Sequence, residues 1–126
     1  MKKAEGGRQR RLREQAGRRA ETAAALWLQL KGYRILERRA RMPACAIDLV
    51  ARKGRFVVFI EVKSRRTRAM ALEAVTPQLR TRLEEAANQW VSRRRGMQDL
   101  VWRFDAVLLA PGRLPRHLRD AWRAQN

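Results

Sequence analysis

The stretch 55–65 limits the possible folds more than any other part of the sequence. Alternate residues of a β-strand point to opposite faces of the sheet, and the run Phe-Val-Val-Phe-Ile over 56–60 is apolar at both sets of positions. A strand that is apolar on both faces has to be covered on both, as the central strand of an α/β fold is. Glu61 and Lys63 follow on the face of Val57 and Phe59, where a pure core would carry no charge.

Three elements before this strand can be predicted from spacing and turn residues. Apolar residues at three- and four-residue intervals predict a helix over 17–31, which Gly32 would end. Strands are expected over 33–40 and 46–53, and Gly54 would form the turn between the second of them and the central strand.

After the central strand the chain reads as a basic loop over 65–69 and then a helix, a strand and a helix. Thr76 and Pro77 are a typical N-cap and first position for a helix that runs to about 95. A further strand is predicted over 101–110 and a short amphipathic helix over 115–123. The predicted fold class is therefore α/β, with a mixed central sheet flanked by helices in the order α-β-β-β-α-β-α. One domain is expected over 17–126, preceded by a flexible basic arm over 1–16.

The positive charge of the chain predicts a polyanionic partner. Thirty Lys and Arg stand against twelve Asp and Glu, which gives a formal net charge of +18. A compact domain with that much like charge repels itself, and phosphates relieve the repulsion while releasing their counterions. We therefore expect nucleic acid as the partner, DNA rather than RNA. An alternative is an assembly protein whose basic surface meets an acidic protein or RNA, and Arg-rich codon usage would explain the preference for Arg over Lys.

The rare residues exclude several classes of protein. One cysteine, Cys45, and one histidine, His117, allow neither an internal disulfide nor a zinc site of thiolates or imidazoles. The longest apolar run, 56–60, is too short to cross a bilayer, and the basic residues 1–19 contain no apolar segment of a secretory signal. A cytoplasmic protein with no membrane partner is expected.

Asp48, Glu61 and Lys63 are the candidate catalytic residues. Asp48 lies six residues before Gly54 and Glu61 seven after it, so a hairpin around Gly54 brings the two carboxylates almost opposite each other. Two carboxylates on a buried surface repel unless a cation lies between them, and Mg²⁺ (or Mn²⁺) suits oxygen ligands. Such an ion activates water for phosphodiester hydrolysis, and Lys63 would orient the water. The alternative is a buried salt bridge of Lys63 with either acid that fixes the strand register.

Asp48 followed by Glu61-Val62-Lys63 on the next strand resembles the PD-(D/E)XK nuclease superfamily, and the element order resembles its restriction-endonuclease-like core. The chain more closely resembles the YraN family of small bacterial proteins. That resemblance rests on Gly17, Glu21 and Ala24 and on the segments 32–36, 47–51, 58–65 and 103–105, which together span 17 to about 109.

The resemblance implies a Mg²⁺-dependent endonuclease that acts on DNA. Asp48, Glu61 and the main-chain carbonyl of Val62 would bind the metal, and Glu21 on the first helix would join them, as in archaeal Holliday-junction resolvases. Those enzymes cleave branched DNA as dimers, so branched DNA and a homodimer are the corresponding expectations. From the residues alone, Glu21 is equally an ion-pair partner of Arg18 or Arg19.

Two departures from the family pattern favour a second reading, a non-catalytic DNA- or RNA-binding module on a nuclease scaffold. Cys45 and Ala46 stand where the family usually has Gly-Glu, and Leu79 lies where it often has Lys.

Outside the acidic group, Arg65, Arg66 and Arg68 are interpreted as a phosphate-binding loop, although a solvated loop has the same composition. Asp105 is expected to pair with Arg103 or a helix end, and His117 to lie on the surface of the last helix.

Overall fold

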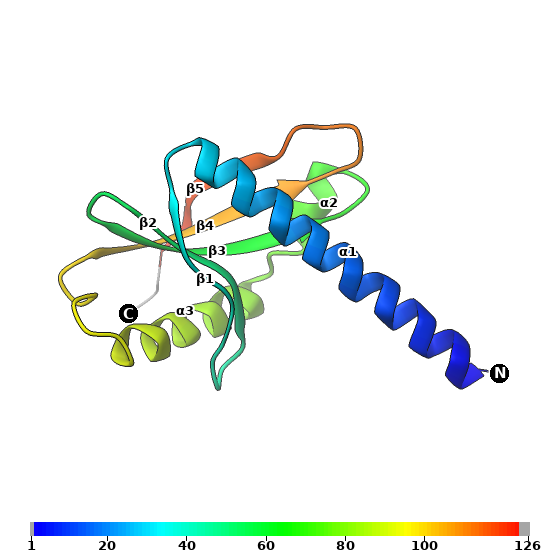
Figure 1. The fold of residues 1–126 in the computed structure, drawn as a ribbon, viewed down its shortest axis with the longest axis horizontal. Helices are drawn as coiled ribbons and strands as arrows, with labels where there is room; N and C mark the ends of the chain where they lie inside the picture. The colour runs from blue at the N-terminus through cyan, green and yellow to red at the C-terminus, as the bar shows by residue number, and fades with distance from the viewer. Residues whose placement is uncertain (1, 124–126) are drawn as a thin grey trace.

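One five-stranded sheet forms the centre of the molecule (Figure 1). The computed structural model describes residues 2–123, and of residues 2–5 only the backbone. The strands lie side by side in chain order, with β3 and β4 parallel and the other pairs antiparallel. They are β1 (Arg34–Arg41), β2 (Ala46–Lys53), β3 (Phe56–Ser64), β4 (Val101–Leu109) and β5 (Arg116–Trp122). The predicted α/β class with a mixed sheet is confirmed, and β3 is its central strand.

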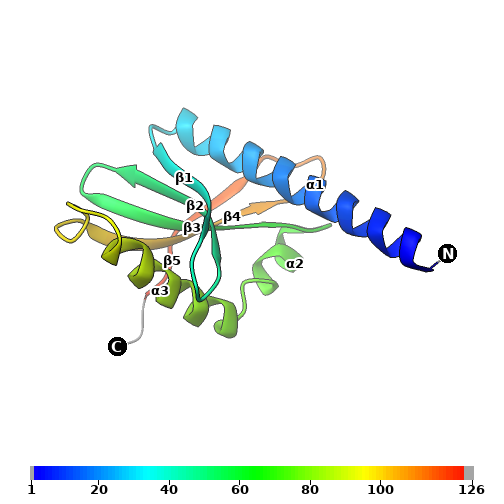
Figure 2. The same cartoon turned by 60° about the horizontal axis from the view of Figure 1, so that its bottom comes forward.

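Helices cover both faces of the sheet, as the apolar pattern of β3 requires. The helix α1 (Lys2–Leu30) crosses one face, and α2 (Arg68–Glu73) and α3 (Pro77–Ser92) lie on the other (Figures 1 and 2). Ala24 and Leu28 of α1 are buried in one cluster with Val58 and Ile60, whereas Phe59 packs edge-on against Trp90 of α3 in the other. Two separate apolar layers therefore fix the position of β3 between them.

Capping residues mark the end of α1 and the start of α3. Gly32, with a φ of +89°, follows the end of α1 in the left-handed conformation that glycine adopts without strain. Thr76 is the N-cap of α3 and accepts a hydrogen bond from the backbone N–H of Leu79 at 3.2 Å, with Pro77 in the first helical position. Both predicted signals are confirmed.

The β2–β3 hairpin opens before β3 ends. The two strands pair from Lys53 opposite Phe56 to Leu49 opposite Ile60, whereas β2 stays paired with β1 as far as Ala46. In Figure 1 the β1–β2 hairpin bends away while β3 continues toward α2. The last residues of β3 thus have β4 on one side and an open fork on the other.

The predicted C-terminal helix over 115–123 is wrong, because these residues form the edge strand β5. Leu118 and Trp122 are four residues apart, a spacing that fits one face of a helix and also one face of a strand. Packing favours the strand over the helix, because in the strand the Trp122 ring stacks on Phe104 with 5.3 Å between the ring centroids. Asp120 adopts a left-handed φ of 52°, and its N–H donates to the Asp105 carboxylate at 2.9 Å.

Two other segments differ from the sequence prediction. The expected loop 65–69 leads into the short helix α2, whose N-cap Thr67 accepts a hydrogen bond from the N–H of Met70 at 3.1 Å. The helix α1 begins at Lys2 rather than near Gly17, so residues 2–16 are its projecting first half (Figures 1 and 2). The predicted mobility of this arm stays a prediction. No helix in the described part of the chain is long and apolar enough to cross a membrane.

Candidate active site

Glu61 and Lys63 lie at the open end of β3. They are two residues apart on one strand, so they share the face that α3 covers. The Lys63 ammonium lies 3.0 Å from a Glu61 carboxylate oxygen, and only 6% of the Glu61 side chain is exposed. A salt bridge between Lys63 and Glu61, which was the alternative to a metal site in the sequence analysis, is therefore present. It accompanies the pair of carboxylates and does not replace it.

Asp48 fills the fork where β2 leaves β3. Its carboxylate accepts the backbone N–H of Val62 at 2.8 Å, which replaces the strand hydrogen bond lost there. Because the N–H and C=O of one strand residue point to the same neighbouring strand, the Val62 carbonyl also faces this fork. Asp48, Glu61 and the Val62 main chain thus converge; the count around Gly54 predicted the first two, and the family resemblance implied Val62.

Glu21 approaches the same place from α1. It is 8% exposed, and its carboxylate accepts from Nε of Arg39 at 2.5 Å. Arg39 lies opposite Asp48 in the β1–β2 register and has a left-handed φ of 52°. That conformation costs a non-glycine residue on the order of 1 kcal/mol, and here it accompanies a side chain that reaches α1. Glu21 is therefore ion-paired, with Arg39 rather than with Arg18 or Arg19.

All four predicted catalytic residues line a single cleft of about 450 Å³ between α1 and the end of β3. The α1 wall is made mostly of small residues, so the cleft stays open down to the carboxylates. Its lining residues are Arg13, Ala16, Gly17, Ala20 and Glu21 from α1, with Asp48, Glu61, Val62, Lys63, Ser64 and Arg65.

The electrostatics of the cleft favour a proton or a cation at the carboxylate pair. Burial, together with the neighbouring charge of Asp48, raises the pKa of Glu61 to about 8. Burial also raises the pKa of Asp48, against the opposing effect of the Val62 N–H. Raised pKa values in both acids mean that too little positive charge surrounds the pair to favour its fully ionised form. Lys63 alone does not neutralise both.

The oxygen donors at the fork fit a hard divalent cation. Asp48, Glu61 and the Val62 carbonyl offer carboxylate and carbonyl oxygens, and Mg²⁺ completes its shell with water where few protein ligands are present. No three His, Cys, Asp or Glu gather as a ligand group among the residues whose side chains are described. The third acid of the cleft, Glu21, is instead held by Arg39.

The three predicted phosphate-binding arginines divide between two places. Arg65 lines the cleft. Arg66 and Arg68 line a neighbouring hollow beside Pro111 and Arg113, and Arg68 donates to the Leu114 carbonyl at 2.6 Å. The structure therefore brings only Arg65 next to the acids.

The residues that depart from the family pattern lie outside the cleft lining. Ala46 is exposed at the start of β2, and Leu79 packs against the α3 side of the core. Neither position places a side chain among the acids.

Sequence reasoning missed two residues, Arg13 and Arg39. Arg13 lies eight residues before Glu21 on α1, a spacing that returns to the same helix face and would have indicated it. Arg39 could have been found by continuing the hairpin pairing one strand further, since it is opposite Asp48.

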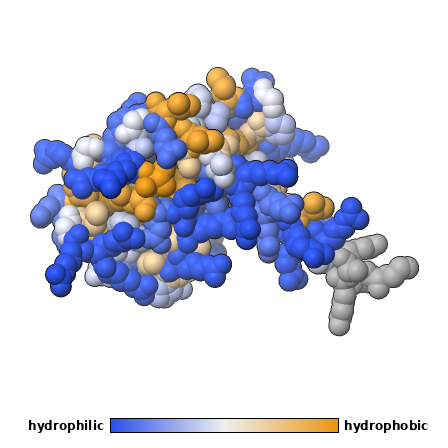
Figure 3. Space-filling model, viewed as in Figure 1, coloured by the Kyte–Doolittle hydropathy of each residue, from blue (hydrophilic) through white to orange (hydrophobic). Residues whose placement is uncertain are grey.

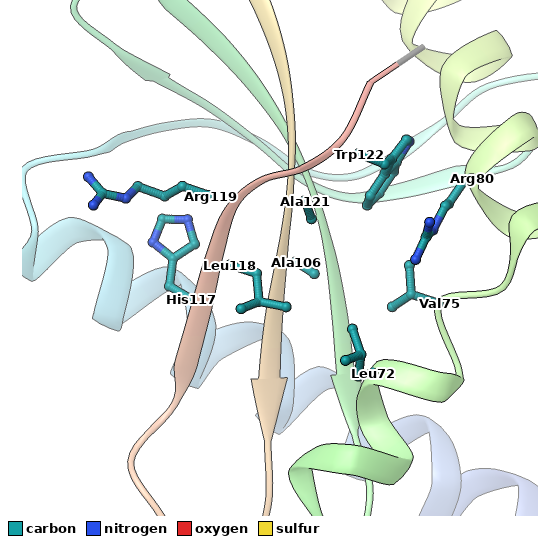
Figure 4. A pocket seen from close by; sticks show the side chains of 9 residues that line it. All are labelled: Leu72, Val75, Arg80, Ala106, His117, Leu118, Arg119, Ala121 and Trp122. Carbon is teal, nitrogen blue, oxygen red and sulfur yellow. The ribbon is translucent and has the colours of Figure 1, made fainter. Parts of the chain in front are cut away.

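A second hollow, of about 490 Å³, lies where β5 extends past α3 (Figure 4). Leu72, Leu118, Ala121 and Trp122 give it an apolar lining, with Arg80 at its edge. The described residues around it include no carboxylate. Although it is slightly larger than the cleft, it offers no carboxylate for a metal, and the ring nitrogens of its histidine, His117, already lie within hydrogen-bond distance of Asp105 and Lys31.

A model of the uncharacterised protein family UPF0102 matches residues 20–109, which include Glu21, Asp48, Glu61 and Lys63. The chain belongs to the UPF0102 family. UPF0102 and the YraN family are the same family, so the match confirms the resemblance to the YraN family.

UPF0102 relatives of high identity cover most of this chain. It is 51% identical over 115 residues to a UPF0102 protein of Maricaulis maris, covering 91% of both chains. A UPF0102 protein of Caulobacter vibrioides is 52% identical over 106 residues, 84% of this chain and 85% of its own. One from Paramagnetospirillum magneticum is 46% identical over 127 residues, 98% of each chain.

Proposed function

We propose that this UPF0102 protein hydrolyses phosphodiester bonds of nucleic acid, DNA in particular, in a metal-dependent reaction at the cleft between α1 and β3. The observation that carries the proposal is the buried pair of Asp48 and Glu61 at the fork, with Lys63 on the same strand face as Glu61. A buried carboxylate pair is destabilising in a purely structural role unless a cation offsets it.

Each residue of the cleft has a role that its position supports. Asp48, Glu61 and the Val62 carbonyl would hold Mg²⁺ or Mn²⁺, which supplies an activated water and neutralises charge on the scissile phosphate. Lys63 keeps an ammonium at the mouth of the pair, where it orients the attacking water and binds phosphate oxygen. Arg65 lines the cleft as a phosphate contact, and Glu21 would assist from α1.

The charge of the whole chain supports nucleic acid as the substrate. A net charge of +18 attracts a polyanion from any direction, and phosphate contacts account for most sequence-independent affinity. The analogy with junction resolvases extends the proposal to branched DNA, as an argument from fold and site alone.

A cleavage assay tests the proposal. Wild type and the Asp48→Ala/Glu61→Ala variant are incubated with labelled single-stranded, duplex, flap and four-way-junction DNA, with Mg²⁺, Mn²⁺ or EDTA. We expect products only with wild type and metal, because the variant loses both carboxylate ligands. Wild type that leaves every DNA form intact in both metals would contradict the proposal.

A non-catalytic binding module is the second candidate. It is favoured by the two ion pairs, Arg39 with Glu21 and Lys63 with Glu61, which leave Asp48 as the acid of the cleft without a salt bridge among the described side chains. This function predicts retarded bands without products, equally strong for wild type and the double variant.

A further inference from the structure

The first half of α1 projects from the domain and is strongly basic. Every residue from 8 to 19 is exposed, and in Figures 1 and 2 this part of the helix extends beyond the sheet and the other helices. Figure 3 shows a mostly hydrophilic surface over the coloured part of this half. Glu14 is the one acid in this stretch, which contains Arg8, Arg10, Arg11, Arg13, Arg18 and Arg19.

The arginines point in all directions around the helix axis rather than along one stripe. Successive residues of an α-helix are turned by about 100°, so residues two apart lie on nearly opposite sides. Arg8 and Arg10 form one such pair, and Arg11 and Arg13 form another. A helix lying on one strand of phosphates needs cations on a single face. Cations on all sides fit a helix with phosphates on both sides of it.

The major groove of duplex DNA has that arrangement. It is about 12 Å wide, admits an α-helix, and is bordered by the phosphates of both strands. Residues 2–16 of α1 give a rod roughly 20 Å long at the usual helical rise. We propose that this projecting half of α1 enters the major groove of double-helical DNA and holds it next to the cleft.

The same geometry selects against double-stranded RNA. The major groove of an A-form duplex is deep and too narrow for side chains to read, so a helix does not fit there. This inference rests on the proposed function and narrows its substrate to DNA that has a duplex arm beside the scissile phosphate.

Arg13 belongs both to the helix segment that would enter the DNA groove and to the acidic cleft. Arg13 is both part of the exposed basic stretch and a lining residue of the cleft that holds Asp48 and Glu61. The projecting half and the wall of the cleft are one uninterrupted helix, from Lys2 to Leu30. A duplex bound along residues 8–13 would therefore direct one of its strands toward the acids.

The test compares two triple variants with equal loss of charge. Arg8, Arg10 and Arg11→Gln removes three charges from the projecting half without touching the cleft lining, and Gln keeps a helix propensity close to that of Arg. Arg82, Arg93 and Arg95→Gln is the matched control, from exposed positions on α3 and directly after it. Circular dichroism verifies that both variants keep the helical content of wild type.

Binding is measured by fluorescence anisotropy with a 20-base-pair DNA duplex, the same duplex as RNA, and single-stranded DNA, each at several salt concentrations in EDTA. We expect the α1 variant to lose roughly tenfold or more in affinity for duplex DNA, and its salt slope to fall by about 2–3 through three lost phosphate contacts. The control and the RNA duplex should change far less.

Methylation of guanine N7 shows whether the protein covers the major groove, because N7 lies in that groove. Wild type should protect a run of guanines from dimethyl sulfate, and the α1 variant should not. Equal affinity losses on all three nucleic acids, or no protection by wild type, would overturn the inference. Neither readout requires cleavage, so a metal-dependent nuclease that binds normally without the three arginines would refute this inference and leave the proposed function intact.

Discussion

At the scale of single residues, the charge of Glu61 depends on its burial and on its neighbour Asp48. Burial and the charge of Asp48 raise its pKa from its ordinary value of 4.5 to about 8. The folded protein therefore holds a proton on Glu61 over a pH range in which the unfolded chain has released it. A divalent cation at the fork would take the place of that proton.

This proton linkage predicts a pH-dependent stability. Because the folded state binds the extra proton between about pH 4.5 and 8, stability falls as the pH rises through that window, by up to about 1.4 kcal/mol per pH unit from this group. Urea unfolding of wild type and Glu61→Gln at pH 5, 6, 7 and 8.5 measures it. The advantage of wild type over the variant should shrink with rising pH, and saturating Mn²⁺ should restore it above pH 8. A difference that stays constant over this range would mean that Glu61 is already ionised in the folded protein.

Arg39 controls whether Glu21 is available to the cleft. Its guanidinium forms an ion pair with the Glu21 carboxylate, and its backbone adopts the left-handed conformation opposite Asp48. Replacing it by Asn, which tolerates that conformation, leaves Glu21 free as a third carboxylate beside the pair.

We expect Arg39→Asn to bind Mn²⁺ several-fold more tightly at pH 7, measured by electron paramagnetic resonance titration. Arg38→Asn is the control, because it removes the same charge from the next residue of β1, which donates to the Thr22 hydroxyl instead. An equal gain in both variants would show a long-range charge effect, and a loss in Arg39→Asn alone would show that Arg39 supports the site.

Most of the acidic group could be predicted at this scale. Counting from Gly54 brought Asp48 next to the end of β3 because the register of a hairpin is set by its turn. The ion pair of Arg39 could not be predicted, since it depends on a backbone conformation that arginine seldom adopts.

At the scale of elements, a buried polar network fixes β5 and the end of α1 to β4. Asp105 of β4 is fully buried and accepts from Arg103, from Nε2 of His117 at 2.6 Å and from the Asp120 N–H. Burial alone would raise the pKa of Asp105, but these bonds outweigh it and lower the pKa. The other ring nitrogen of His117 lies 2.7 Å from the Lys31 ammonium, just past α1.

Asp105→Ala should therefore destabilise the fold by about 3–5 kcal/mol, because it leaves Arg103 and His117 without their buried partner. Asp99→Ala, at an exposed position before β4, should stay within about 0.5 kcal/mol of wild type. Urea unfolding monitored by tryptophan fluorescence measures both. A loss below about 1 kcal/mol in Asp105→Ala would mean that apolar packing, such as Trp122 on Phe104, suffices to hold β5.

The same network explains why the last element was predicted wrongly. Asp105 was expected to pair with Arg103 or with a helix end, and the ion pair with Arg103 is confirmed. The predicted surface position of His117 was wrong, since only 1% of its side chain is exposed. Its burial depends on Asp105, Tyr33 and Lys31, which are distant in the sequence, and no local pattern over 115–123 carries that information.

At the scale of the whole molecule, charge and chemistry are separated along α1. The second half of the helix contributes Ala24 and Leu28 to the core and Glu21 to the cleft, whereas residues 8–19 are exposed. The basic character of residues 1–16 could be predicted from the sequence, but the helical form of residues 2–16 could not, because three glycines, Gly6, Gly7 and Gly17, lower the helix propensity in and next to this segment.

This division has an evolutionary consequence. Substitutions over residues 8–12 meet neither the core nor the carboxylates, so selection on folding and on chemistry leaves them free to vary. The family model matches residues 20–109, which include Glu21 and not residues 8–12. Selection can therefore act on the basic surface of residues 8–12 separately from the acidic cleft, whose Glu21, Asp48 and Glu61 lie elsewhere in the chain.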